Sequence, residues 1–202
     1  MEIDPKDLIE SNSDKEQSKS RLNSAVAVTI ALLATFMGIC KVKDDNICQA
    51  MQQAQAKQVD TWGYYQAKNT QEKVYETALT QLEVQQLSLS GAALARAVKA
   101  KKSFGDMADH EKDEKAKLKT EAEGYVKQYD DLNYKDDQFD LSDATLAIAI
   151  SLLAVTSLTQ KRALFIFAMV PTAIGLLMGC AGLFGWHIHS DAISNLLSVI
   201  NP

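Results

Sequence analysis

Three long apolar stretches limit the folds that this chain can adopt. Ser24–Cys40 and Ala163–Trp186 contain no charged residue, and Leu141–Leu158 contains only Asp143. Each reaches the length of roughly 17–25 residues that an α-helix needs to cross a hydrocarbon core of about 30 Å. A cleaved signal peptide would not follow a long leader of mixed charge, so we interpret the first stretch as an anchor. The sequence therefore predicts three transmembrane helices, which we place at residues 23–42, 141–158 and 163–186.

Small residues recur at helical spacing within these stretches. Gly175, Gly179 and Gly182 form one stripe in the third stretch, and Ala147 and Ser151 belong to another in the second. Small side chains let transmembrane helices approach closely, so that dispersion and weak hydrogen bonds hold them together. The stripes predict packing within a three-helix bundle, and the glycine stripe could also serve a dimer.

The charges that flank the apolar stretches indicate an orientation. Lys161 and Arg162 lie in the short link between the second and third stretches, and Arg21 precedes the first. Because basic residues favour the cytoplasmic side, we expect a cytoplasmic N-terminus and an outside location for residues 43–140. Lys41, at the other end of the first stretch, weakens this bias.

Residues 43–140 are polar, contain no proline and predict long helices. Apolar residues recur at steps of three and four from Ile47 to Tyr65 and again from Leu118 to Leu132, as in helices. The segment leaves one span and returns to the next, so two antiparallel helices are the simplest solution. The predicted fold class is an all-α membrane protein with a long extramembrane antiparallel helical hairpin between the first and second transmembrane helices.

Two glycine-containing sequences divide the far part of this hairpin. Gly91 lies near its midpoint, and a second breaker is expected at residues 103–106, Ser-Phe-Gly-Asp. A short alanine-rich helix would lie between them. We therefore expect a structured tip near residues 87–106.

The segment 61–71, TWGYYQAKNTQ, contains a cluster of aromatic residues. On a helix, Trp62 and Tyr65 share a face that we expect to pack against the returning helix. Tyr64, Lys68 and Tyr75 share the opposite face, a second face that we expect to point away from that helix. The candidate interaction and packing residues are Trp62, Tyr64, Tyr65, Gln66, Lys68 and Tyr75. Beyond Gln66 the apolar face changes side, so either the helix breaks near Asn69 or it changes its partner, for which a second subunit is one choice.

The same segment carries a family resemblance. Trp62-Gly63-Tyr64-Tyr65-Gln66-Ala67-Lys68 fits the pattern W-x-Y-Y-Q-A-K, and it follows one span and precedes a charged hairpin with two closing spans. In this order the elements resemble a bacterial family, the domain of unknown function 4337, over roughly residues 22–186. The resemblance implies a small bacterial membrane protein in the inner membrane, and it implies no reaction, substrate or catalytic residue.

No catalytic or metal-binding motif is visible. Phosphate-binding loops, nucleophile motifs and zinc motifs are absent, and Cys40, Cys48 and Cys180 have no metal spacing. His187 and His189 could bind a metal only with other ligands, and we interpret them as polar residues at the membrane interface. We therefore predict no catalytic residue, no metal, no cofactor and no enzymatic activity.

Three further expectations concern Asp143 and the chain ends. Asp143 could be a proton site inside the membrane, but an acid at a helix start, with Asp140 as N-cap, is the preferred interpretation. Residues 1–22 are expected to form a flexible polar tail. Residues 187–202 fit an amphipathic helix on the membrane surface.

The net charge of -5 argues against nucleic acid as a partner. We expect a structural or protein-interaction role, as a scaffold or in assembly, with the lipid bilayer and either a second copy or another membrane protein as partners. The alternative is a subunit of an oligomeric channel or transporter. Its path would be lined by Asp143, Thr29, Thr35 and Thr172.

Overall fold

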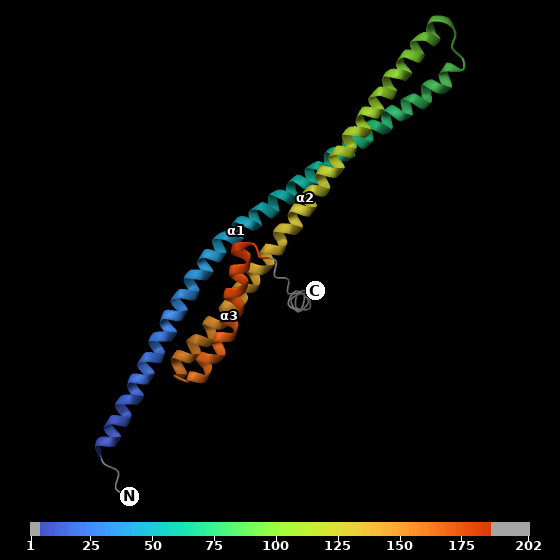
Figure 1. Cartoon of the computed structure of the whole chain (residues 1–202). Coiled ribbons are helices and arrows are strands. Elements are labelled where there is room, and N and C mark those ends of the chain that lie inside the picture. Colours follow the sequence, from blue (N-terminus) through green and yellow to red (C-terminus); the bar gives the residue numbers. More distant parts are fainter. Residues whose placement is uncertain (1–4, 187–202) are drawn as a thin grey trace. The chain divides into compact units, whose positions relative to one another are not determined.

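The computed structural model describes residues 5–186 of the chain, with side chains from Glu16 onward. Within that range the protein is helical and has three helices, α1 (Pro5–Gln86), α2 (Gly91–Thr159) and α3 (Arg162–Phe184) (Figure 1). Each helix contains a stretch that is long and apolar enough to cross a membrane. The segment 187–202 and the pair His187 and His189 lie outside the described residues.

The chain divides into two compact units. Unit 1 comprises residues 1–48 and 133–202, and unit 2 comprises residues 49–132. Helices α1 and α2 contribute to both units, whereas α3 belongs to unit 1 alone. The two units differ in composition and in the contacts that hold them, so each is described by itself.

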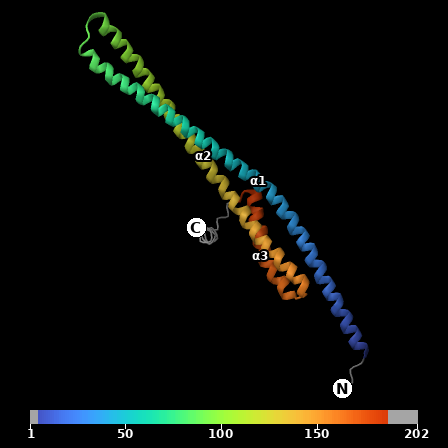
Figure 2. The ribbon, with the colours of Figure 1, turned by 180° about the vertical axis from the view of Figure 1, so that it is seen from behind.

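In unit 1, α3 lies beside the last part of α2, as Figures 1 and 2 show from opposite sides. The two helices are joined by only Gln160 and Lys161, and Gln160 adopts a left-handed backbone conformation with φ of 54°. Residues from all three helices form one buried core. Its fully buried members are Val26, Leu33, Leu146, Ala149, Leu153 and Ala168.

Three glycines of α3 form notches that larger side chains fill. A Cβ atom added at Gly175 would lie 2.6 Å from Leu146 Cγ, and one at Gly179 would lie 2.6 Å from Phe36 Cε1. At Gly182 it would lie 2.8 Å from Phe139 Cζ. Real Cβ atoms do not approach so closely, so these backbone positions accept no side chain without a shift. In an apolar bundle this fit of shapes supplies the dispersion contacts between helices.

Not every predicted small-residue face takes part in this packing. Ala147 and Ser151 of α2 are exposed, and no atom lies within 4 Å of a Cβ added at Gly38 of α1. The fit within unit 1 therefore uses the small face of α3 and the large residues of α1 and α2.

A buried hydrogen bond also joins α2 to α3. Ser142 Oγ donates to the backbone carbonyl oxygen of Gly175 at 2.8 Å, and Ser142 is fully buried. Most other hydroxyls in the apolar part bond within their own helix, as Thr172 does to the carbonyl of Ala168. Ser142 is therefore the polar group that ties the second apolar stretch to the glycine face.

In unit 2, segments of α1 and α2 lie side by side and run in opposite directions. Lys57 Nζ lies 5.6 Å from the ring centroid of Tyr125, Tyr75 stacks on Phe104 at 6.1 Å, and Glu83 pairs with Lys101 at 2.7 Å. In these three contacts the residue number in α2 falls as the residue number in α1 rises, so the two segments are antiparallel. The two segments are joined by a turn at residues 87–90.

The residues that face the partner helix recur at alternating steps of four and three in both segments of unit 2. We call these positions the seam. In α1 the seam consists of Met51, Ala54, Gln58, Thr61, Tyr65, Lys68, Glu72, Tyr75, Leu79, Leu82 and Gln86, all buried or half-buried. In α2 it consists of Ala97, Lys101, Phe104, Ala108, Glu111, Lys115, Leu118, Ala122, Tyr125, Tyr129 and Leu132.

Several expectations about helix ends are wrong. Helix α1 runs through Asn69 without a break, which excludes one of the two alternatives given for that segment. Helix α2 runs through residues 103–106, so the second predicted breaker does not interrupt a helix, whereas the turn between the helices ends at Gly91, the first one. A glycine inside a long helix costs about 1 kcal/mol relative to alanine, which the surrounding contacts of a helix easily exceed. Asp140 is not an N-cap, because α2 begins at Gly91.

The N-terminal boundary also differs from the expectation. Helix α1 begins at Pro5, whereas the sequence predicted a flexible tail as far as residue 22. Proline suits the first turn of a helix, because its missing N–H has no partner there. The following polar residues include no further proline or glycine before the apolar stretch.

Candidate functional site

The aromatic segment 61–71 lies on α1 in unit 2, and its residues divide between the seam and the surface. Trp62 and Tyr65 are half-buried and form an edge-to-face pair with ring centroids 5.2 Å apart. Tyr64 is 66% exposed, and Gln66 is exposed as well. Tyr64 is therefore the large aromatic residue of this segment that is free to contact another molecule.

The expected second face is not a free surface as a whole. Lys68 Nζ lies 2.8 Å from Glu111 Oε2, and Tyr75 stacks on Phe104, so both residues bind α2 of the same chain. The prediction that Lys68 and Tyr75 point away from the returning helix is wrong. It assumed that the seam passes through Trp62, but Thr61 is the buried residue, and the seam continues from Tyr65 to Lys68, Glu72 and Tyr75.

Two ion pairs lie in the seam at positions where the sequence has charged residues instead of apolar ones. Besides Lys68 and Glu111, Lys115 Nζ contacts Glu72 and donates to Asn69 Oδ1 at 3.1 Å. Glu72 and Glu111 are 5% and 8% exposed, so both carboxylates have left water. Removal of one partner from such a pair leaves a buried charge, so we expect these pairs to fix the register of the two helices.

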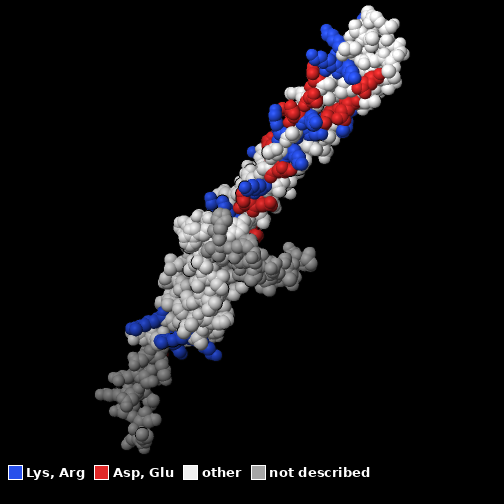
Figure 3. All heavy atoms as spheres, turned by 45° about the vertical axis from the view of Figure 1, so that its right-hand side comes forward, with Lys and Arg blue, Asp and Glu red and all other residues white. Residues whose placement is uncertain are grey.

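The far end of unit 2 has the opposite character. Residues 84–95, which we call the tip, carry no charge. Leu87 is 88% exposed, Val84 is 65% exposed and Leu94 is partly exposed. We call the rest of unit 2 the stem. Figure 3 shows the tip as uncharged, whereas basic and acidic side chains alternate along the stem. An exposed apolar patch that borders a charged surface is typical of an interaction site.

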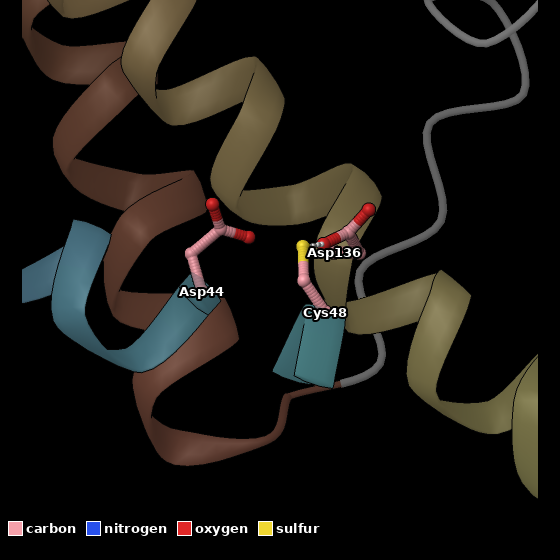
Figure 4. A group of neighbouring side chains, drawn as sticks. All are labelled: Asp44, Cys48 and Asp136. Carbon is pink, nitrogen blue, oxygen red and sulfur yellow. Dashed lines mark hydrogen bonds between the residues drawn. The ribbon is translucent and has the colours of Figure 1, made fainter. Parts of the chain in front are cut away.

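A polar cluster lies in unit 1, where α1 and α2 leave the apolar stretches. It consists of Asp44 and Cys48 on α1 and Asp136 on α2, and we call it the thiol–carboxylate cluster (Figure 4). Cys48 Sγ donates a hydrogen bond to Asp136 Oδ1 at 3.1 Å. One ligand atom from each residue lies within 4.8 Å of the other two.

The surroundings of Cys48 and Asp136 favour the protonated form of each of these two side chains. The hydrogen bond to Asp136 and burial raise the pKa of the Cys48 thiol to about 11. Burial raises the pKa of the Asp136 carboxyl; the thiol bond lowers it, and the neighbouring Asp44 carboxyl raises it again. Negative charges are thus crowded here without enough cations to balance them.

Sequence reasoning did not find this cluster. Cys48 and Asp136 are 88 residues apart, and the cysteine spacing gave no metal pattern. The available indication was local, because Asp44 and Cys48 are four residues apart and so share one face of a helix. The ion-pair residues Glu72, Glu111 and Lys115 were missed for a similar reason, since charged residues were assigned to the solvated faces.

Asp143 lies in the middle of α2, in unit 1, and not at a helix start. Its side chain is half-buried, and its Oδ1 atom is buried without a hydrogen-bond partner among the described residues. The hydroxyls of Thr29, Thr35 and Thr172, by contrast, each donate to a backbone carbonyl one turn earlier. Of the four residues expected along a channel path, only Asp143 has an unused polar atom.

Over residues 5–186 these features define an all-helical protein of three helices, two of them very long, each apolar enough in part to cross a membrane. The family described as "Domain of unknown function (DUF4337)" matches residues 22–185, so the chain belongs to that family. No curated protein and no solved structure matches the chain.

Proposed function

We propose that this protein is a membrane-anchored helical hairpin with a structural or protein-interaction role, as a scaffold or in assembly, and without catalytic activity. Unit 1 is its anchor and unit 2 is the hairpin outside the bilayer. The observation that carries the proposal is the tip, which exposes Leu87 and Val84 in a stretch without charge.

The surface of unit 1 supports the anchor. All three helices turn large apolar side chains outward, where lipid would cover them. Examples with at least half of the side chain exposed are Val28, Leu32, Ile39, Ile148, Ile166, Phe167, Val170 and Leu177. Soluble proteins rarely expose apolar surface on this scale, whereas a lipid-facing surface needs it.

Charges at one end of unit 1 support the orientation. Arg21 and Arg162 line one pocket together, and Arg162 donates a hydrogen bond to Ser18 Oγ. Lys161 adjoins them in the chain, and Figure 3 shows basic side chains at this end. By the positive-inside rule this end lies in the cytoplasm, which places unit 2 outside, in a bacterial cell at the outer face of the inner membrane.

The seam supports an antiparallel coiled coil in unit 2. Steps of four and three average 3.5 residues, the repeat that makes two helices wind around each other. Lys68, Glu72 and Tyr75 of the α1 seam contact α2 of the same chain, so the paired helices of unit 2 do not require a second chain. The partner therefore binds the tip and the surface around Tyr64, and a second copy is the partner we expect first.

Crosslinking tests this proposal. Leu87→Cys should give an intersubunit disulfide in native membranes, in a background with Cys40, Cys48 and Cys180 replaced by alanine or serine. Lys119→Cys, an exposed stem position, is the matched control and should not crosslink. Leu87→Asp should abolish the association and preserve helix content. A protein that stays a 22.2 kDa monomer and retains no other protein through purification would overturn the proposal.

A second candidate function is a subunit of an oligomeric channel or transporter. It rests on Asp143 in the second apolar stretch, whose buried Oδ1 has no hydrogen-bond partner among the residues that the structure describes. Carboxylates at such positions are costly in lipid and commonly belong to ion or proton paths. Proteoliposomes with wild-type protein should then conduct protons or cations and lose this flux with Asp143→Asn. Absent or unchanged flux excludes this candidate.

A further inference from the structure

The thiol–carboxylate cluster brings together three groups that can bind a metal ion. Asp44 and Cys48 are one helical turn apart on α1, and Asp136 approaches from α2 (Figure 4). All three residues belong to unit 1. Their ligand atoms lie within 4.8 Å of one another, and the sulfur and one carboxylate oxygen are already 3.1 Å apart.

Asp44 supplies an observation independent of the clustering. The residue is only 4% exposed, and Lys41 Nζ binds its Oδ2 at 2.7 Å. Its Oδ1 is buried and receives no hydrogen bond among the described residues. Figure 4 shows one carboxylate oxygen of Asp44 turned toward Cys48 and Asp136. A buried acceptor without a donor is costly, and a cation would satisfy it.

The ligand types indicate which cation fits. A thiolate disfavours magnesium and calcium, which prefer oxygen ligands alone, and it favours zinc and related divalent ions. Bond lengths of about 2.0–2.3 Å around zinc put neighbouring ligand atoms roughly 3.3–3.7 Å apart in a tetrahedron. The cluster is close to this size, so small side-chain rotations would close it around an ion.

We propose that Asp44, Cys48 and Asp136 bind one divalent cation of the zinc class, with the fourth position left for water or an added ligand. The ion links α1 to α2 just outside the apolar stretches. It neutralises the crowded carboxylates and satisfies Asp44 Oδ1. Because binding requires the folded arrangement of both helices, the ion also stabilises unit 1 against unfolding.

Metal titration of the full-length protein in detergent tests this proposal. Wild-type protein should bind one Zn²⁺ per chain, and Co²⁺ in its place should give a thiolate-to-cobalt charge-transfer absorption. Cys48→Ser, which preserves the size and the hydrogen bond to Asp136, should abolish that absorption and weaken Zn²⁺ binding at least tenfold. Asp44→Asn and Asp136→Asn should weaken binding to a similar extent.

Matched controls separate this site from others in the chain. Asp45→Asn changes an exposed acid next to Asp44, and Cys180→Ser changes a cysteine outside the cluster, so both should bind Zn²⁺ as the wild type does. Helix content by circular dichroism checks that each variant folds. The proposal is overturned if folded wild-type protein binds no Zn²⁺. It is equally overturned if binding survives Cys48→Ser but is lost when His187 and His189 are replaced by alanine.

Discussion

Helices pack against one another in both unit 1 and unit 2, but the contacts that hold them together differ in kind. In unit 1 the side chains of Leu146, Phe36 and Phe139 pack directly against three glycines of α3, so these contacts depend on complementary shape. In unit 2 the helices meet at a narrow seam that contains alanines and two ion pairs. The difference follows from the surroundings we propose for each unit.

The solvent decides which interaction can hold helices together. In lipid, apolar side chains gain nothing by leaving their surroundings, so close fit and an occasional hydrogen bond must supply the attraction. In water, burial of apolar area drives association, and ion pairs in the interface add register more than stability. The following predictions test this contrast, from the largest expected effect to the smallest.

Replacement of Lys115 by leucine should have the largest effect on unit 2. The change leaves the Glu72 carboxylate buried without its cation, which costs roughly 3 kcal/mol, the low end for a broken buried pair. Thermal unfolding followed by circular dichroism measures the loss.

The double variant Glu72→Leu/Lys115→Leu is the control for that prediction. It should recover most of the stability, because an apolar pair of similar volume replaces a buried ion pair at little cost. If the double variant is as unstable as the single one, the pair supplies stability rather than register.

Gly179→Ala should destabilise unit 1 by about 1–3 kcal/mol, because the new methyl group would overlap the ring of Phe36 and the hydroxyl of Ser142. Gly38→Ala is the matched control, since nothing lies within 4 Å of the added Cβ there. It should be neutral or slightly stabilising. Unfolding in detergent compares the two, and equal effects would show that the glycine notch carries no packing.

Ser142→Ala should have a smaller effect on the same unit. It removes the hydrogen bond to the carbonyl of Gly175, and such bonds in membranes contribute about 0.6 kcal/mol. Ser151→Ala, on an exposed face with a bond inside its own helix, is the control and should change less. A loss at Ser142 several times larger would mean that polar contacts, rather than shape, dominate unit 1.

Tyr64→Ala should leave the stability of the chain within about 0.5 kcal/mol, because the residue is exposed and outside the seam. The same change at Tyr65, half-buried against Trp62, should cost more. Thermal unfolding of both variants makes the comparison. A large loss at Tyr64 would show that an intramolecular contact, not a partner, uses this side chain.

The three apolar stretches and the helical character of the described residues follow directly from the sequence. Blocks without charge set the apolar helices, and the scarcity of glycine and proline between them sets the long ones. The seam was harder to find because Lys68, Glu72 and Gln58 occupy positions where an apolar residue is expected. With the charged residues assigned to solvent, Trp62 appeared to continue the apolar face, and the true repeat through Thr61 was lost.

The candidate site was beyond sequence reasoning for a different reason. Asp44 and Cys48 share a helix face, but only folding brings Asp136 to them. The glycine stripe of α3 was predicted from the sequence, but the large side chains that pack into its notches were not. Which of the large residues fills each notch depends on the relative shift of α1, α2 and α3, and no local pattern specifies that shift.

The central claim is that unit 1 lies in lipid and unit 2 in water. Spin labels on cysteines at Leu32 and Phe167 of unit 1 and at Lys73 and Lys119 of unit 2 test it most directly in reconstituted bilayers. All four side chains are exposed, so the label should report the surrounding solvent. We predict that oxygen reaches the first two labels preferentially and that a water-soluble nickel complex reaches the last two. Nickel access at Leu32 and Phe167 equal to that at Lys119 would contradict the account.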